Sequence, residues 1–283
     1  MKRILLLGGS GMLGTELRAA LANRDVIAPS SSDVDLTDGA KVAAFAAGCD
    51  VVVNAAAYTD VDGAEADEAG AFAVNRDGAR NAATAATAVG ARFVHISTDY
   101  VFDGAATAPY PEAAALAPRS AYGRSKAEGE RAVAEAHARP IIVRTAWLYG
   151  RSGRNFARTI ASLAGRQPTV SVVTDQRGQP TWARDVAAVI VRLLDARVEG
   201  GTFHATSSGE ASWFAFAREI FRAVGEDPDR VVPTTTDGRS RAAPRPAYSV
   251  LGHDAWATVG IAPLPDWRDS FARAVRAGVL ENI

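Results

Sequence analysis

Short apolar runs alternate with alanine-rich stretches through the first half of the chain. A continuous apolar run of this kind is typical of a strand that is buried on both faces of a sheet. The runs predicted as strands are residues 3–7, 26–28, 51–57, 93–97 and 141–144. The stretches predicted as helices are residues 15–22, 40–47, 65–89 and 122–136. Alternation of strands with helices indicates a parallel sheet that has helices on both faces.

After Gly150 the pattern becomes looser. Residues 170–175 predict one more strand, and residues 184–196 predict an amphipathic helix. Another helix, over residues 213–224, is expected to begin after Ser212, which would cap it. The positions expected on the buried face of the 184–196 helix are Val186, Val189, Ile190 and Leu193. Residues 226–250 are rich in Pro, Thr, Arg and Asp and predict a loop.

These patterns predict an α/β fold, namely a Rossmann-type doubly wound parallel sheet with a smaller C-terminal substrate-binding region. We expect residues 1–150 to form the dinucleotide-binding domain and residues 170–200 to rejoin its sheet. Residues 151–169 and 201–283 are expected to form the substrate-binding region. Ligands of such sheets bind at the carboxyl ends of the strands.

A glycine-rich loop joins the first predicted strand to the first predicted helix. Its glycines are spaced as Gly8-x-x-Gly11-x-x-Gly14. Glycine lets the backbone turn tightly and approach a pyrophosphate, and a helix N-terminus offers free N–H groups and the positive end of a dipole. The loop therefore predicts a dinucleotide site. The run before it is too short for a secretory signal, and glycine interrupts it.

A second motif lies at residues 97–126, where Thr98 at a strand end is followed by Tyr122-x-x-x-Lys126. Positions i and i+4 share one face of a helix, so Tyr122 and Lys126 can point into the same cleft. We expect the nearby cation to lower the pKa of the Tyr122 phenol toward neutrality, which would make it a general acid. The Thr98 hydroxyl can donate a hydrogen bond to the carbonyl oxygen of the substrate that Tyr122 would protonate.

Composition excludes several classes of function. A hydrophobic content of 48% and a charged content of 22% fit an ordinary globular protein. The net charge of −1 gives no attraction to nucleic acid or to an anionic membrane, and no apolar stretch is long enough to span a bilayer. Cys49 is the single cysteine, which excludes an intrachain disulfide and fits the cytoplasm. The histidines are scattered and show no metal-binding spacing, so we expect no metal.

With these motifs, the chain resembles the extended short-chain dehydrogenases/reductases, and in particular the dTDP-4-dehydrorhamnose reductase family. The segments that carry the closer resemblance are residues 53–62, 97–104, 144–149, 175–181 and 245–251. The resemblance covers nearly the whole chain. It implies reduction of the 4-keto group of a nucleotide-linked 6-deoxysugar, above all of dTDP-4-dehydro-L-rhamnose to dTDP-L-rhamnose. The implied cofactor is NADPH, with NADH also compatible, and the implied assembly is a monomer or a weak homodimer.

The resemblance also implies roles for individual residues. Tyr122 would be the proton donor, Lys126 would hold the nicotinamide ribose, and Thr98 would bind the substrate oxygen. The implied cofactor-binding residues are Gly8, Ser10, Gly11, Met12, Leu13 and Gly14 at the glycine loop, Ser30, Asp35 and Leu36, Ala55, Ala56, Ala57, Tyr58, Thr59 and Ser97, together with Tyr122 and Lys126. The implied substrate-binding residues are Thr98, Asp99, Trp147, Gln176 and Arg245, the last as a clamp on the substrate pyrophosphate.

Two departures from the family pattern change the expectations. The second strand ends in Pro29 and three serines, with neither a carboxylate to repel a 2′-phosphate nor an arginine to require one. Some family members bind magnesium between subunits through glutamates, and Glu16 matches one such position. Arg184 stands where another such glutamate is expected, so a magnesium-linked dimer is not expected.

Competing functions remain open at this point. A 4,6-dehydratase needs a glutamate after Thr98-Asp99, but Tyr100 is there instead. A nucleotide-sugar epimerase is an alternative. Another is a non-catalytic NADP-binding regulator, since the chain also resembles the regulatory subunit of methionine adenosyltransferase. Consumption of NADPH with a 4-keto-6-deoxy nucleotide sugar would distinguish the reductase from the regulator.

Overall fold

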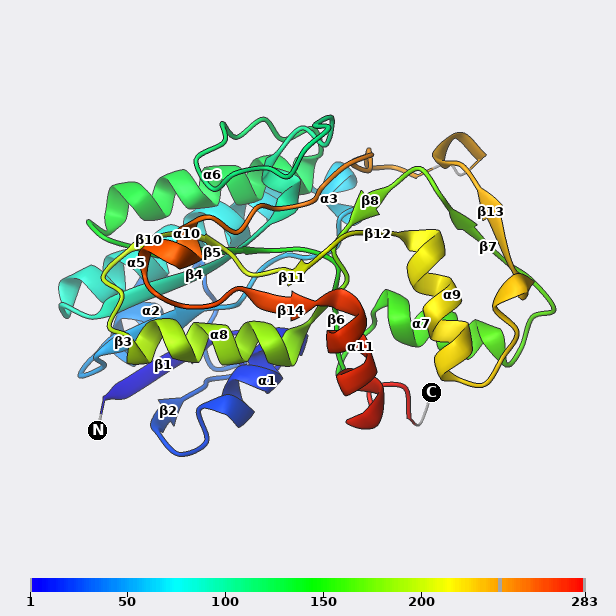
Figure 1. Ribbon diagram of the computed structural model, residues 1–283. Helices are drawn as coiled ribbons and strands as arrows, with labels where there is room; N and C mark the ends of the chain where they lie inside the picture. Colours follow the sequence, from blue (N-terminus) through cyan, green and yellow to red (C-terminus); the bar gives the residue numbers. More distant parts are fainter. Residues whose placement is uncertain (1, 239–240, 282–283) are drawn as a thin grey trace.

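A six-stranded parallel sheet forms the centre of the computed structural model, which describes residues 2–238 and 241–281 (Figure 1). Its strands are β1 (Arg3–Leu7), β2 (Asp25–Ile27), β3 (Val51–Asn54), β4 (Arg92–Thr98), β5 (Ile141–Thr145) and β10 (Gly201–His204). They follow the order β10-β5-β4-β3-β1-β2. The chain therefore changes direction across the sheet between β1 and β3, which is where such folds bind ligands. The predicted doubly wound parallel sheet is confirmed.

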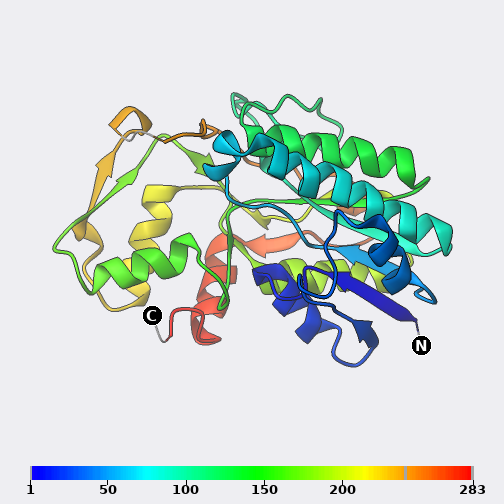
Figure 2. The ribbon, with the colours of Figure 1, turned by 180° about the vertical axis from the view of Figure 1, so that it is seen from behind.

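Helices cover both faces of the sheet, as Figures 1 and 2 show. On one face lie α1 (Met12–Ala20) and α8 (Ala183–Asp195). On the other lie α2 (Gly39–Ala46), α5 (Ala79–Ala88) and α6 (Ala121–Ala136). Successive side chains of a strand point to opposite faces. Ile4 and Leu6 of β1 accordingly pack with α1 and α8, while Leu5 and Leu7 pack with α2 and α5. This explains why the strands read as continuous apolar runs.

The single helix predicted over residues 65–89 is wrong, because the structure divides this segment. It contains α3 (Gly63–Ala66), α4 (Glu68–Phe72), a π-helical turn η1 (Ala73–Gly78) and α5. Asp67 ends the first helix and begins the second, since its carboxylate accepts a hydrogen bond from the amide of Gly70 at 2.9 Å. The π-helical turn contains Asn75, whose side chain is buried. Turns of this kind occur frequently at functional sites.

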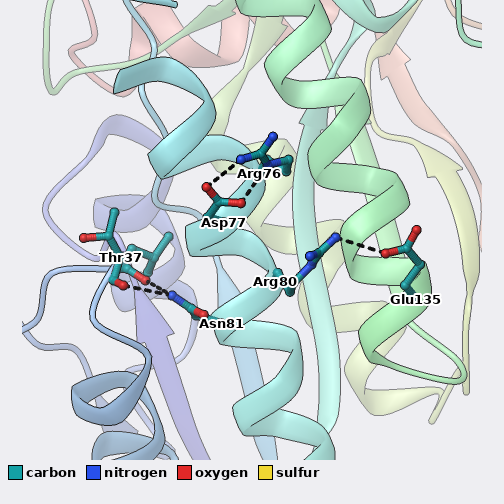
Figure 3. Close-up of polar contacts among 7 residues, drawn as sticks. Thr37, Arg76, Asp77, Arg80, Asn81 and Glu135 are labelled. Carbon is teal, nitrogen blue, oxygen red and sulfur yellow. Dashed lines mark hydrogen bonds and ion pairs between the residues drawn. The ribbon is translucent and has the colours of Figure 1, made fainter. Parts of the chain in front are cut away.

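Polar contacts link this segment to its neighbours, as Figure 3 shows. The Asn81 amide nitrogen donates to the carbonyl oxygens of Leu36 and Thr37, at 3.0 and 3.1 Å. Arg80 of α5 forms an ion pair with Glu135 of α6 at 3.0 Å. A Cβ on Gly78 would lie 2.8 Å from the Leu36 side chain, so this glycine lets α5 approach closely. These contacts hold the chain after β2 in place.

The C-terminal region has its own core beside the sheet (Figure 1). Its helices are α7 (Phe156–Ala164), α9 (Trp213–Ala223) and α11 (Trp267–Arg276), and its longest strands are β7 (Val170–Val173) and β13 (Val231–Thr234). Ser212 caps α9 as predicted, because its hydroxyl accepts from the amide of Ala215 at 3.1 Å. The loop predicted over residues 226–250 instead contains β13, which pairs in parallel with β7. It also contains two 3₁₀ turns, η3 (Pro228–Arg230) and η4 (Thr236–Gly238).

The segment that rejoins the sheet differs from the one expected from the sequence. Within residues 170–200, β7 pairs outside the central sheet, and α8 packs on its face. The sixth strand is β10, which was expected to belong to the substrate-binding region. It pairs with β5, with Phe203 opposite Val143. The run Gly201–His204 contains a single large apolar residue, Phe203, so it lacks the apolar pattern that marks the other strands.

Short strand pairs and a short helix join the two regions. The pairs are β6 (Leu148–Tyr149) with β9 (Thr181–Trp182), β8 (Arg177–Gly178) with β12 (Ala211–Ser212), and β11 (Ser207–Ser208) with β14 (Leu264–Asp266). The short helix is α10 (Ala255–Thr258), and a further 3₁₀ turn, η2 (Asp99–Val101), follows β4. Within residues 2–238 and 241–281, no helix has the length and apolar character that crossing a membrane requires.

Candidate active site

The end of β4 and the first turns of α6 form a buried polar corner, which is called the catalytic corner below. Helix α6 begins after Ser120, whose hydroxyl accepts from the amide of Gly123 at 3.0 Å. This cap places Tyr122 and Lys126 one turn apart beside the end of β4, and both side chains are buried. The Lys126 ammonium donates to the carbonyl oxygen of Ile96 at 2.6 Å. Thr98 lies close enough to Tyr122 for its hydroxyl to influence the pKa of the phenol.

The pKa of Tyr122 differs from the expectation. Burial raises the pKa of this phenol to about 12, and the nearby Asp99 carboxylate adds to the rise, while hydrogen bonding with Thr98 opposes it. The predicted lowering by Lys126 is wrong for this structure. Removal of water disfavours the charged phenolate, and the negative charge of Asp99 acts in the same direction. Tyr122 therefore carries its proton at neutral pH.

The charge of Lys126 depends on two opposing effects. Burial lowers the pKa of its ammonium to about 8, and the carboxylate of Glu130, one turn further along α6, opposes this change. Glu130 in turn forms a buried bidentate pair with Arg144 of β5, with N–O distances of 2.9 and 2.7 Å. This pair fixes a negative charge near Lys126 and ties α6 to the sheet.

Asn75 connects the catalytic corner to the loop after β3, and sequence reasoning missed it. Its side chain accepts from the amide of Tyr58 at 2.9 Å and donates to the Tyr58 carbonyl at 3.0 Å. It also donates to the hydroxyl of Ser125 at 2.9 Å, and Ser125 donates to the carbonyl of Tyr122. One amide thus holds both segments. Asn75 lies in the middle of an apparently regular helical run, so its spacing gave no signal.

The glycine loop is as tight as its sequence suggested. Gly8 has a φ of +79°, and a Cβ there would lie 2.5 Å from the amide nitrogen of Ala56. A Cβ on Gly14 would lie 2.0 Å from the Gly8 carbonyl oxygen. Gly11, by contrast, is exposed, and no side chain in the described part of the chain caps the N-terminus of α1. The loop and the helix therefore fit a dinucleotide pyrophosphate, which backbone N–H groups would bind.

The other predicted cofactor residues surround this loop. Ser10, Ser30 and Asp35 are exposed, and Leu36 is buried under α5. The Asp35 carboxylate accepts from the amide and the hydroxyl of Thr37, so it is turned toward its own loop. The predicted cofactor residues on the loop after β3 and at the end of β4 range from exposed to buried. They are Ala55, Ala56, Ala57, Tyr58, Thr59 and Ser97. Met12 is partly exposed and Leu13 is buried in the core.

Two buried polar atoms at the end of β4 have no hydrogen-bond partner among the described residues, namely Ser97 Oγ and Asp99 Oδ2. The other carboxylate oxygen of Asp99 accepts from the Thr98 hydroxyl at 3.0 Å. Burial raises the pKa of Asp99 to about 6, and the hydroxyls of Ser249 and Thr98 oppose this rise. Buried polar atoms without a partner are rare in native proteins, and a catalytic role is one of their known causes.

A cavity of about 630 Å³ lies between α7, β7 and α9. Gln176 and Arg245 line it, whereas Thr98 and Tyr122 do not. Trp147 follows β5, whose last residue, Thr145, pairs with Thr98 in the sheet. Trp147 has an unusual φ of +47°, and its ring stacks on Trp213, which also lines the cavity, with centroids 3.4 Å apart. A strained backbone at a bulky residue is common at functional sites.

Asp62, which follows β3, holds the arginine that was predicted to bind the substrate pyrophosphate. Its carboxylate accepts from Arg245 at 2.7 Å and from the Ala243 amide at 3.1 Å, and Arg241 lies 3.4 Å away. Burial works against the Asp62 carboxylate, but the hydrogen bond from Ala243 and the charge of Arg245 lower its pKa overall. Both arginines line the cavity. A carboxylate of the sheet region thus orients the cations of the substrate region.

Glu16 and Arg184 form an ion pair with an N–O distance of 3.0 Å. Glu16 is buried, and the Arg184 guanidinium also lies over the Trp182 ring. The structure groups no set of three or more metal-ligating side chains anywhere in residues 2–238 and 241–281. A guanidinium that already neutralises the glutamate does not fit a shared magnesium site, and the expectation that no metal binds remains a prediction.

Comparisons with known proteins place this geometry in context. The family model of the RmlD substrate binding domain matches residues 1–279. A probable dTDP-4,6-dihydroxy-2-methyloxan-3-one 4-ketoreductase of Streptomyces antibioticus is 47% identical over 282 residues, covering 96% of this chain and 94% of its own. A dTDP-4-dehydrorhamnose reductase of Mycobacterium tuberculosis H37Rv is 44% identical over 283 residues, covering 98% of this chain and 93% of its own. The Bacillus anthracis dTDP-4-dehydrorhamnose reductase, solved in complex with NADP, is 36% identical and superposes with a TM-score of 0.94. The match covers 98% of this chain and 99% of that one.

Proposed function

We propose a function from the premise that this chain belongs to the RmlD substrate binding domain family. The protein is an NADPH-dependent oxidoreductase that reduces the 4-keto group of a dTDP-linked 6-deoxysugar, most specifically dTDP-4-dehydro-L-rhamnose to dTDP-L-rhamnose. The observation that carries the proposal is the buried catalytic corner of Thr98, Tyr122 and Lys126 at the carboxyl end of β4. A regulator that only binds a cofactor would not need this set of proton-transfer groups.

The residues of the catalytic corner supply the proton and the polarisation. The bound cofactor would supply the hydride for the carbonyl carbon. Tyr122, which is protonated at neutral pH, donates its proton to the developing alkoxide oxygen. The Thr98 hydroxyl, which donates to Asp99 in this structure, would turn its hydrogen toward the same oxygen. Lys126 holds the ribose of the cofactor and provides a positive charge, which Glu130 helps to maintain.

The 630 Å³ cavity suits the nucleotide part of the substrate. Arg245, oriented by Asp62, would bind the diphosphate, because a guanidinium makes strong charge-assisted hydrogen bonds to phosphate oxygens. Trp147, which stacks on Trp213 at the edge of the cavity, would line the sugar site. Asp99 and Gln176 would bind polar groups of the substrate. In this arrangement the 4-keto group lies at Tyr122 and the base lies in the cavity.

The direct test is an NADPH oxidation assay on the purified full chain. The panel contains dTDP-4-dehydro-L-rhamnose and dTDP-4-keto-6-deoxy-D-glucose, because relatives of this chain act on different dTDP-sugars according to their names. We expect turnover that is fastest with the rhamnose precursor. Faster turnover of the glucose derivative would keep the reaction class and change the sugar. Binding of NADPH without turnover of either sugar would favour the regulatory function.

Two finer proposals concern the setting of the enzyme. We assign it to the cytoplasm, because its single cysteine, Cys49, is buried and unpaired, as in proteins of reducing compartments. We also propose a monomer or a weak homodimer, since Arg184 occupies the place of a magnesium ligand beside Glu16. Light scattering with and without magnesium should give the same mass. A mass that doubles with magnesium would contradict the proposal.

A further inference from the structure

An arginine from α1 reaches the end of β2, where the sequence shows neither a carboxylate nor an arginine. The Arg18 Cδ atom lies 3.3 Å from the position that a Cβ on Gly9 would occupy. The same position is 3.0 Å from the Cβ of Ala28, the residue that follows β2. The Arg18 side chain therefore extends between the glycine loop and the end of β2. In Rossmann-type folds this is the place of the adenosine ribose.

The Arg18 guanidinium is available to a ligand. Arg18 is exposed, and it makes no hydrogen bond or ion pair with any described residue. Two other arginines near this edge of the sheet are engaged, since Arg3 pairs with Asp25 at 2.9 Å and Arg24 pairs with Asp195 at 2.7 Å. An unpaired arginine that lies along a cofactor loop differs from these surface ion pairs.

The first carboxylate after β2 is already engaged. Asp33 accepts hydrogen bonds from the amide and the hydroxyl of Ser30, at 2.9 and 2.6 Å, and these bonds lower its pKa. The Asp33 carboxylate is therefore anionic, but it points to Ser30 of the same turn. The hydroxyls of Ser30 and Ser32, 2.7 Å apart, lie on the same exposed turn. The turn thus offers hydroxyl groups, and α1 offers a cation.

We infer that Arg18 binds the 2′-phosphate of NADPH and so determines the preference for NADPH over NADH. This inference rests on the proposed function for the identity of the cofactor. A planar guanidinium matches a phosphate with two parallel hydrogen bonds and stays charged at every physiological pH. The ribose of NADH carries a hydroxyl at that position, so Arg18 would add little to its binding. Selectivity would come from helix α1, not from β2 itself.

The test compares cofactor binding to the wild-type chain, Arg18→Gln, Arg18→Glu and a control, Arg131→Gln, by calorimetry and thermal shift. Arg131 is also an exposed helical arginine, but it lies on α6, which covers the opposite face of the sheet. The probes are NADP⁺, NAD⁺, 2′,5′-ADP and 5′-AMP. Glutamine and glutamate are both good helix formers, so α1 should stay folded.

We expect Arg18→Gln to weaken NADP⁺ and 2′,5′-ADP by roughly 10- to 50-fold, and Arg18→Glu to weaken them further. NAD⁺ and 5′-AMP should change by less than about threefold, because neither carries the phosphate that the guanidinium would bind. The salt dependence of NADP⁺ binding should also decrease in both variants, since a charge pair has been removed.

Equal losses for NADP⁺ and NAD⁺ would overturn the inference, because they would indicate a general effect on the loop. An unchanged NADP⁺ affinity in both Arg18 variants would also overturn it and leave the proposed function intact. If the wild-type chain bound neither NADP⁺ nor NAD⁺, the proposed function itself would fail. The outcomes of the two proposals are therefore distinguishable.

Discussion

The catalytic corner and the 630 Å³ cavity both contain charged side chains, but they hold these side chains in different ways. At the corner, Lys126 and Glu130 are almost fully buried, and each has a protein partner within 3 Å. At the cavity, Arg245 and Asp62 are partly open to solvent, with 16% and 34% of their side chains exposed. The groups of the corner are therefore fixed by the protein itself, whereas Asp62 orients Arg245 and leaves it partly open to a diphosphate.

This difference has a physical reason. A proton donor must be held close to its acceptor, so the groups around it are fixed by buried hydrogen bonds. Loss of such a bond destabilises the folded state, because it leaves a buried polar group unpaired. A cation that binds a nucleotide must keep hydrogen-bond donors open to its ligand, so Arg245 is only partly buried beside Asp62. The predicted consequence is that variants at the corner affect turnover, and variants at the cavity affect affinity.

Tyr122→Phe tests the corner and has the largest expected effect. The substitution keeps the ring and removes only the proton, so kcat should fall by roughly 10²- to 10⁴-fold. Cofactor binding should persist, as measured by the thermal shift with NADP⁺. Thr98→Val should be milder, because it removes a single hydrogen bond. A Tyr122→Phe enzyme that reduced the ketone at nearly the wild-type rate would eliminate this proton donor.

Arg245→Ala and Asp62→Asn test the cavity. Removing the cation, or the carboxylate that orients it, should raise the KM for the dTDP-sugar by about 10- to 100-fold. The kcat and the Kd for NADP⁺ should change little. Arg222→Ala is the matched control, because Arg222 pairs with Glu219 on α9 and does not line the cavity. If Asp62→Asn lowered kcat and left KM unchanged, the division between corner and cavity would be wrong.

Asp99→Asn tests the buried charge of the corner through stability. The folded pKa of Asp99 is about 6, above the ordinary value near 4, so the native state binds this proton more tightly than the unfolded chain. Its ionisation therefore destabilises the wild-type protein as pH rises from about 4 to 6 and beyond, until both states are ionised. Asparagine avoids this penalty.

The gain from Asp99→Asn should therefore depend on pH. Relative to wild type, the free energy of unfolding of the variant should increase by about 1 kcal/mol between pH 5 and pH 8. Urea denaturation of both proteins at the two pH values measures this change. Asp103→Asn is a control, because Asp103 is only partly buried and its pKa is lowered rather than raised. A difference that is independent of pH would show that Asp99 is not penalised when charged.

The regular part of the fold could be predicted from the sequence, because its signals are local. The apolar runs of β1, β3 and β4 alternate with helical stretches, which predicts a parallel sheet. The right-handed crossover between consecutive parallel strands then limits the order in which they can pair. The glycine spacing of the Gly8–Gly14 loop and the Tyr122–Lys126 pair are local as well. One face of α6 and one tight turn are enough to bring these groups to the sheet edge.

Tertiary structure alone decided the rest. Strand β10 has a single large apolar residue, and only its pairing with β5 makes it a strand. Asn75 and Asp62 contact groups from elements distant in sequence, so no spacing along the chain could reveal these contacts. The pKa of Tyr122 rose instead of falling because burial, which a sequence does not state, disfavours the phenolate. The sequence by itself determined which groups are present and which local turns hold them; packing decided which groups meet and how much water remains around them.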